Sequence, residues 1–288
     1  ILDKSSFKNI KIDKNEKYSL IHLAAVHFDF QKKFYPTNVL GTKNILEFIS
    51  ENKNITSYVF FSSVATYGES ENGKDEDSVQ IPYNDYGKSK LEAEKLILKW
   101  KENVFHVNTI IIRPAVVYGE YNFGNVFNLI QQIKGGFFAN IGSGNNIKSI
   151  AYVENIVDSV LFCIENINDS FFIYNYSDYP QKSVKKQVKS ISSLFNGKRF
   201  ITIPLWFTKI FTYPIDLIEK LIKIDLKFNS MRIKKITIPT YFIADKIRSI
   251  GFSQAVPFEE SLLKTNKWIK NVDIIDLRKK WYSKAKKL

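Results

Sequence analysis

The residues with the clearest capacity for chemistry are Tyr86 and Lys90, which stand four residues apart where a helical pattern begins. On a helix, residues with this spacing share one face. A neighbouring ammonium favours the phenolate and lowers the pKa of a tyrosine from its ordinary value of about 10. Such a tyrosine can take a proton from a sugar hydroxyl, or return one, while a hydride moves elsewhere. If Ser63 hydrogen-bonds the same oxygen, the three residues can interconvert an alcohol and a ketone.

The Tyr-x-x-x-Lys spacing alone is unspecific, because tyrosine and lysine are both abundant in this chain. The alternative interpretation is a surface tyrosine and a solvated lysine on an amphipathic helix. Similarly, Ser62 and Ser63 could serve only to satisfy the end of a strand. The order of the surrounding motifs decides between these interpretations.

The composition is that of a globular protein, with 44% apolar and 25% charged residues in a chain of 288. A single cysteine, Cys163, excludes an internal disulfide and suits a reducing compartment, so we expect a cytoplasmic protein. One cysteine and three histidines without zinc-binding spacing predict no metal site. The chain contains no uninterrupted run of about 18 apolar residues, which argues against a transmembrane helix.

The net charge of +13 raises the question of a nucleic-acid partner. The lysines are spread along the whole chain and concentrate only in the tail 278–287, which favours a solvated basic surface, and we expect no nucleic-acid partner. Peripheral contact of this tail with anionic lipid stays open. The apolar stretch 206–224, broken at Pro214, is interpreted as a buried helix, with an amphipathic membrane-surface element as the alternative.

Apolar runs alternate with helical periodicity along the chain, a pattern that indicates βαβ units and a parallel sheet. The segment 69–80 is polar and is interpreted as a loop. We expect strands at 19–24, 58–61, 107–112 and 171–174, and helices at 38–51, 85–101, 126–134, 153–167, 182–195, 244–250 and 258–269.

A series of motifs in register resembles the extended short-chain dehydrogenase/reductase superfamily, and within it the NAD-dependent nucleotide-sugar epimerase/dehydratase family. Each motif is weak by itself, but their shared order covers nearly the whole chain. The motifs lie at 21–25, 38–44, 61–68, 86–90, 113–119, 152–155 and 244–252.

The resemblance implies an α/β fold with a Rossmann-type doubly wound parallel sheet and a smaller C-terminal substrate-binding lobe. We expect residues 1–117 to be the remainder of the NAD(P)-binding domain. Residues 118–288 would form mainly the substrate lobe, with 147–176 returning to the Rossmann sheet. The family opens with a Gly-rich turn that holds the pyrophosphate, and this sequence has none. We therefore expect about 55–60 residues, the first two βαβ units, to be missing ahead of Ile1.

The resemblance also implies roles for the reactive residues. Tyr86 would be the acid/base, and Lys90 would bind the nicotinamide ribose and lower the pKa of Tyr86. Ser63 would hold the reacting sugar oxygen. Asn38 would steady the lysine through the backbone or a water, although it could instead be only a helix N-cap.

The remaining site residues follow from the same resemblance. Lys148 falls where the family often has an arginine for the diphosphate; a lysine binds phosphate as a point charge without the bidentate fork. The expected cofactor contacts are Leu23, Ala24, Ala25, Ser62, Tyr86, Lys90, Pro114, Ala115 and Val116, and the expected substrate contacts are Ser63, Asn125 and Lys148.

The implied function is an NAD- or NADP-dependent epimerase or 4-keto-sugar reductase. Its substrate would be a nucleotide-activated hexose, UDP-linked, in surface polysaccharide biosynthesis, and the full-length protein would be a homodimer. Val64 and Ala65 follow Ser63 where a 4,6-dehydratase would carry an Asp-Glu pair, which argues against a dehydratase. The alternative is a non-catalytic dinucleotide- or sugar-binding scaffold, which the absent Gly-rich turn would suit.

Overall fold

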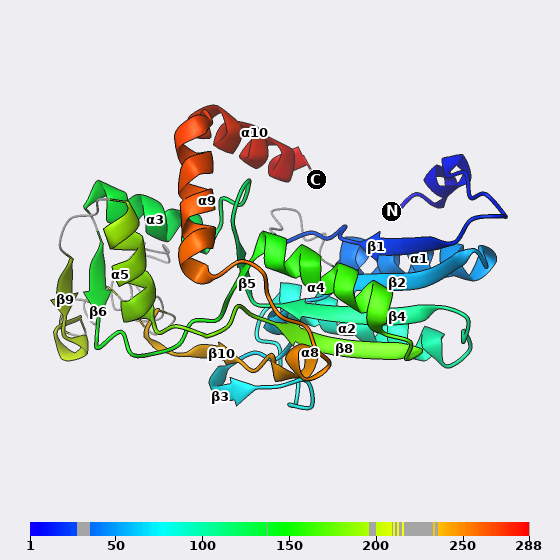
Figure 1. Ribbon diagram of the computed structural model, residues 1–288, viewed down its shortest axis with the longest axis horizontal. Coiled ribbons are helices and arrows are strands. Elements are labelled where there is room, and N and C mark those ends of the chain that lie inside the picture. Colours follow the sequence, from blue (N-terminus) through cyan, green and yellow to red (C-terminus); the bar gives the residue numbers. More distant parts are fainter. Residues whose placement is uncertain are drawn as a thin grey trace.

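The structure, a computed structural model, describes residues 1–27, 35–136, 138–195, 200–208 and 236–287, with the single positions 210, 212, 215 and 233. Its elements form a sheet with flanking helices at one end and a smaller lobe at the other (Figure 1). The helices α9 (Phe258–Asn271) and α10 (Ile274–Lys287) rise above the region between them.

Four parallel strands form the main sheet in the order β1-β2-β4-β8. Their apolar side chains alternate between the two faces, as the pleat of a strand requires. On β2, Tyr58 and Phe60 pack with the helices α1 (Gly41–Glu51) and α2 (Asp85–Lys101), whereas Val59 packs on the opposite side with α4 (Val153–Asn166). The strands are β1 (Tyr18–His22), β2 (Ile55–Phe61), β4 (Asn108–Pro114) and β8 (Phe171–Tyr176).

Helices therefore cover both faces of a parallel sheet, and the predicted fold class is confirmed. Figure 1 shows α4 in front of the sheet and α1 and α2 behind it. In the described parts of the chain, no helix combines the length and apolar character needed to cross a bilayer.

The lobe has its own apolar core, built where α3, α5 and α9 meet. Three further strand pairs are short and parallel: β5 with β7, β6 with β9, and β3 with β10. Helix α8 (Asp245–Ser249) belongs with the main sheet, because its Ile247 packs into the core that contains Val59 and Tyr174. The other elements are β3 (Ser70–Lys74), β5 (Val116–Tyr118), α3 (Asn125–Gly135), β6 (Ala139–Ile141), β7 (Ile150–Tyr152), α5 (Val184–Leu194), β9 (Ile201–Ile203) and β10 (Thr240–Phe242).

One expectation about local structure is wrong. The segment 69–80 is not all loop, because its polar residues 70–74 form β3, which β10 pairs from far along the chain. The basic tail, for which the sequence predicted no structure, lies in the helix α10, which packs Ile274 and Leu277 against the lobe core. Most of the expected helix 206–224 lies outside the described residues.

The first turn of α2 lies directly against the short 3-10 turn η3 (Val64–Thr66) because residue 87 is a glycine. Asn84 caps the helix by accepting a hydrogen bond from the Gly87 amide at 2.7 Å. A Cβ at Gly87 would lie 2.4 Å from the carbonyl oxygen of Ala65, closer than any real contact allows. This close approach sets the separation between the helix that carries Tyr86 and the strand end that carries Ser63.

We predict that Gly87→Ala forces α2 away from η3 and lowers the free energy of unfolding by about 1–3 kcal/mol, the usual effect of overpacking. The matched control is Gly41→Ala, where the three atoms nearest to the new Cβ belong to the flexible side chain of Ile1. Urea unfolding of both variants measures the difference. Equal stability of the two variants would contradict the steric role of Gly87.

Candidate active site

The carboxyl ends of β1, β2 and β4 lie at one edge of the sheet, because all three strands are parallel. Residues 23–25 follow β1, Ser62 and Ser63 follow β2, and Ala115 follows β4. Ligands of open α/β sheets bind outside this edge. Helix α2 adds Tyr86 and Lys90, so the structure gathers most of the expected site residues in one place.

Tyr86 lies between Ser63 and His27. Burial raises the pKa of Tyr86 to about 12, and hydrogen bonding with the Ser63 side chain offsets part of that rise. The His27 ring meets the Tyr86 ring edge-on, with centroids 4.7 Å apart. Sequence reasoning missed His27, although its position two residues after the expected cofactor residues 23–25 was a usable signal.

Lys90 is only 2% exposed, and its side chain reaches the carboxyl end of β2. Its Nζ donates to the Phe61 carbonyl at 2.7 Å and lies 4.7 Å from the centroid of the Phe60 ring. Burial lowers the pKa of Lys90 to about 8, and the Glu94 carboxylate opposes that change.

Burial is the largest influence on the pKa of Tyr86 in this structure, and the hydrogen bond with Ser63 lowers that pKa. The Lys90 ammonium is directed to the Phe61 carbonyl. A lowering of the Tyr86 pKa by Lys90 therefore stays a prediction.

Asn38 joins the loop after β1 to helix α2. Its Oδ1 accepts a hydrogen bond from the Val26 amide at 2.8 Å, and its Nδ2 donates to the Val26 carbonyl at 3.1 Å and to Ser89 Oγ at 2.9 Å. Ser89 Oγ donates in turn to the Tyr86 carbonyl at 2.8 Å. Asn38 sits inside the π-helical turn η2 (Pro36–Leu40), so it is not an N-cap, and it reaches the neighbour of Lys90 rather than Lys90 itself.

A buried ion pair lies beneath these residues. Glu94 is 1% exposed and Arg113 is 4% exposed. The guanidinium binds the carboxylate at two points, with Nε to Oε1 at 3.0 Å and Nη2 to Oε2 at 2.7 Å. The Ser62 hydroxyl also donates to Glu94, so this expected cofactor residue directs its side chain into the network.

The network extends past the ion pair. Arg113 Nη1 donates to the Tyr67 hydroxyl at 2.6 Å, which donates to Asn175 Oδ1 on β8 at 2.8 Å. Sequence reasoning did not identify Glu94 as part of the site. The usable signals were its position four residues after Lys90 and the presence of a charged Arg113 at the end of an apolar strand.

The other expected site residues lie in different surroundings. Leu23 and Ala24 are exposed, whereas Pro114 and Ala115 are buried and Val116 is half-buried. Asn125 is exposed at the start of α3. Lys148 is half-buried in the lobe, where its Nζ donates to the Ile238 carbonyl and burial lowers its pKa to about 8.

The sequence matches the NAD dependent epimerase/dehydratase family over residues 3–175, more than half of the chain. The chain belongs to this family. The prediction of an NAD(P)-dependent enzyme from the epimerase/dehydratase group is therefore confirmed.

Curated relatives of this family member include two bacterial 4-epimerases. The N-acetyl-alpha-D-glucosaminyl-diphospho-ditrans,octacis-undecaprenol 4-epimerase of Escherichia coli O157:H7 is 34% identical over 252 residues, covering 86% of this chain and 76% of the relative. The UDP-glucose 4-epimerase of Vibrio cholerae is 29% identical over 181 residues, covering 60% and 54% respectively.

A solved structure of the same fold is the UDP-glucuronic acid 4-epimerase from Bacillus cereus in complex with NAD. It superimposes with a TM-score of 0.69 at 18% identity, covering 93% of this chain and 77% of that one. At this identity the likeness shows the fold alone.

We predict that Glu94→Gln lowers the free energy of unfolding by about 3–5 kcal/mol, because it leaves the buried Arg113 cation without its counter-charge. The control is Glu92→Gln, which breaks an exposed ion pair with Lys95 and should change stability by less than about 1 kcal/mol. Chemical denaturation measures the free energy of unfolding of both variants. Similar free energies would show that the buried Arg113 does not need Glu94 as its counter-charge.

Proposed function

We propose that this chain is an NAD(P)-dependent 4-epimerase of a hexose carried on a diphosphate. The observation that supports the proposal is the contact of Ser63 with Tyr86 at the carboxyl edge of the sheet, with Lys90 one helical turn further along. Both curated relatives described above are 4-epimerases by name, which favours epimerisation over reduction.

The residues present suit the nicotinamide end of the cofactor. Leu23 and Ala24 offer a small apolar surface, exposed where β1 ends. The Lys90 ammonium has three N–H donors and directs one to the Phe61 carbonyl, so two would remain for the ribose hydroxyls of a bound cofactor. When bound, the nicotinamide accepts a hydride from the sugar and returns it.

Tyr86 would act as the general acid and base, transferring the proton of the C4 oxygen. With a pKa of about 12 the phenol holds its proton at neutral pH, which suits the return of a proton to a 4-keto oxygen. Its action as a base requires the pKa to fall, and positive charge at the nicotinamide end lowers it.

The proposed reaction is redox-neutral overall. A bound nicotinamide would supply the acceptance of hydride from C4 and its return to the opposite face of the 4-keto sugar. Tyr86 would take the proton of the C4 hydroxyl when the ketone forms and would give it back when the ketone is reduced. The Ser63 hydroxyl would hydrogen-bond the C4 oxygen throughout.

The substrate class that we favour is an N-acetylhexosamine linked through diphosphate to a polyprenol. This follows the Escherichia coli relative, which is more similar to this chain, over a longer stretch, than the Vibrio cholerae enzyme. A UDP-linked hexose, the substrate expected from the sequence, is the second candidate.

We predict that the protein, expressed with whatever sequence precedes Ile1 in its reading frame, interconverts N-acetylglucosaminyl- and N-acetylgalactosaminyl-diphospho-undecaprenol. The two sugars are released by mild acid and separated by chromatography, because the products have equal mass. UDP-N-acetylglucosamine is assayed in parallel. Turnover of the nucleotide sugar alone would move the proposal to the second candidate, and turnover of neither would contradict it.

We predict that Tyr86→Phe lowers kcat by about 10²–10⁴-fold with little change in substrate affinity, because the ring stays while the acid/base hydroxyl is lost. Tyr83→Phe is the matched control, since Tyr83 is an exposed tyrosine just ahead of the same helix. Steady-state kinetics of both variants test the assignment, and a Tyr86 variant with near-wild-type kcat would refute it.

A further inference from the structure

The end of the lobe that carries α5 and β9 combines exposed apolar side chains with exposed lysines. Ile201 on β9 is 73% exposed, and Trp206 and Ile210 in the segment that follows are 65% and 57% exposed. Trp206 packs edge-on against Phe207, which is itself 41% exposed. Large apolar side chains gathered at this exposure mark an interaction surface.

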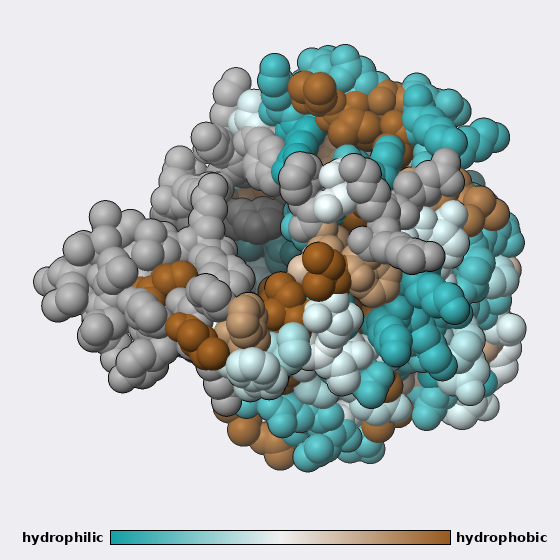
Figure 2. All heavy atoms as spheres, turned by 90° about the vertical axis from the view of Figure 1, so that its left-hand side faces the viewer, coloured by the Kyte–Doolittle hydropathy of each residue, from teal (hydrophilic) through white to brown (hydrophobic). Residues whose placement is uncertain are grey.

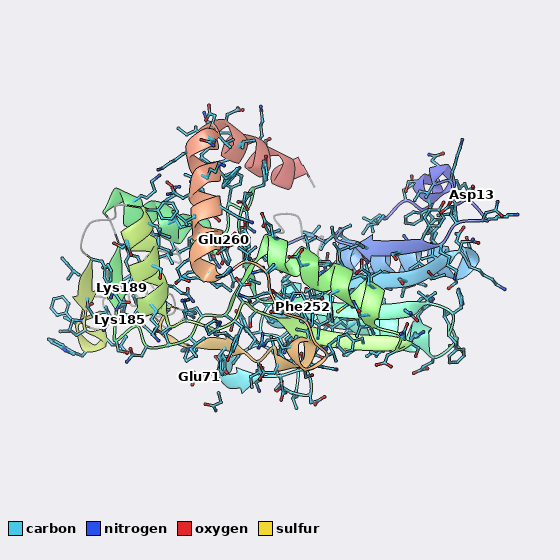
Figure 3. The ribbon with its side chains drawn as sticks, viewed as in Figure 1. Asp13, Glu71, Lys185, Lys189, Phe252 and Glu260 are labelled. Carbon is cyan, nitrogen blue, oxygen red and sulfur yellow. The ribbon has the colours of Figure 1, made fainter. Side chains whose placement is uncertain are left out.

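Lysines of α5 lie beside these apolar residues. Lys185 and Lys189 are exposed and stand four residues apart, so they share one side of the helix, while Val188 and Ile191 face the lobe core (Figure 3). The turn that contains Gly142 and Gly144 connects the two elements. The Lys185 amide donates to the Gly144 carbonyl, and the Gly142 amide donates to the Ile203 carbonyl, each at 2.9 Å.

Figure 2 looks onto this end of the molecule and shows apolar side chains gathered near its centre, with hydrophilic side chains beside them. We call the residues Lys185, Lys189, Ile201, Trp206 and Ile210 the α5–β9 face.

The charge of this part of the chain has one sign. Between Asp178 and Asp216 the sequence contains no aspartate or glutamate. Among the residues that the structure describes, Glu259 forms an ion pair with Lys182, which lies just ahead of α5 and outside the α5–β9 face. The basic residues of this acid-free stretch are Lys182, Lys185, Lys186, Lys189, Lys198, Arg199 and Lys209.

We propose that the α5–β9 face is a docking surface for an anionic lipid bilayer. Apolar and aromatic side chains at a membrane interface bury in the headgroup region, while neighbouring lysines bind acidic headgroups. The combination of one-sign charge with exposed aliphatic and aromatic residues fits this partner better than a protein surface or a nucleic acid. The inference rests on the proposed function, because a polyprenol-linked sugar is presented to the enzyme at a membrane.

The experiment measures co-sedimentation of the full-length protein with vesicles in the absence of any sugar substrate. Vesicles of phosphatidylcholine alone are compared with vesicles that also contain phosphatidylglycerol. We expect binding to the anionic vesicles, weak binding to the neutral ones, and release as ionic strength rises from about 0.1 M to about 1 M, where charges are screened within about 3 Å. Equal affinity for both vesicle types would overturn the inference.

Two double variants locate the surface. Lys185→Gln with Lys189→Gln should weaken binding to anionic vesicles by about 30-fold, since each lysine near the surface contributes about fivefold. Trp206→Ser with Phe207→Ser should also weaken binding to anionic vesicles at low salt, because the variant lacks the aromatic side chains that would bury in the headgroup region. The control is a double variant, Lys99→Gln with Phe105→Ser. Lys99 is exposed in the last turn of α2, and Phe105 is exposed in the loop that follows. This control should bind vesicles as the parent protein does.

Thermal unfolding of each variant shows whether it is folded, and a misfolded Trp206/Phe207 variant leaves the surface lysine pair as the deciding test. Activity is measured separately on lipid-linked sugar dispersed in detergent. Turnover in detergent without vesicle binding overturns the docking surface and leaves the proposed function intact. If the parent protein binds vesicles, the Lys185→Gln/Lys189→Gln variant binds them more weakly, and no turnover is seen, the docking surface is supported and the proposed function is contradicted. Binding of duplex DNA in place of vesicles would also overturn the inference.

Discussion

The carboxylate of Glu94 is the buried charge on which the arrangement of the site depends. It accepts hydrogen bonds from Arg113 at the end of β4 and from Ser62 after β2, while its own helix α2 also carries Tyr86 and Lys90. A carboxylate this buried is tolerable only while its donors stay in place. The need of Glu94 for hydrogen-bond donors therefore holds the ends of β2 and β4 in a fixed position relative to helix α2.

Two further constraints act on the same helix from different directions. The missing side chain of Gly87 lets α2 approach the Ala65 carbonyl, which determines how near Tyr86 comes to Ser63. Asn38 links α2 to Val26 in the loop after β1, where cofactor contacts are expected. The contact of Gly87 is steric and the contact of Asn38 is polar. Together they fix the position of Tyr86 relative to the ends of β1 and β2.

Local signals predicted the parts of the fold that depend on local interactions. Helix α2 begins and ends where its Asn84 cap and apolar spacing placed it, and the alternation of strands with helices predicted the parallel sheet. The polar strand β3 escaped prediction because its partner β10 lies far along the chain and neither strand shows a regular pattern. The direction of the Lys90 side chain depends on the Phe61 carbonyl and on burial, and neither is visible in a Tyr-x-x-x-Lys spacing.

The burial of Lys90 has a consequence for the proton balance of ligand binding. Its folded-state pKa of about 8 lies below the ordinary lysine value, so above pH 8 the folded protein carries this amine largely neutral while an unfolded chain still holds the proton. A ligand whose oxygens accept hydrogen bonds from the ammonium favours the charged form and raises that pKa. Binding of such a ligand then takes up a proton from the buffer, and its affinity declines as the pH rises beyond 8. The observed heat of association would consequently depend on the ionisation enthalpy of the buffer.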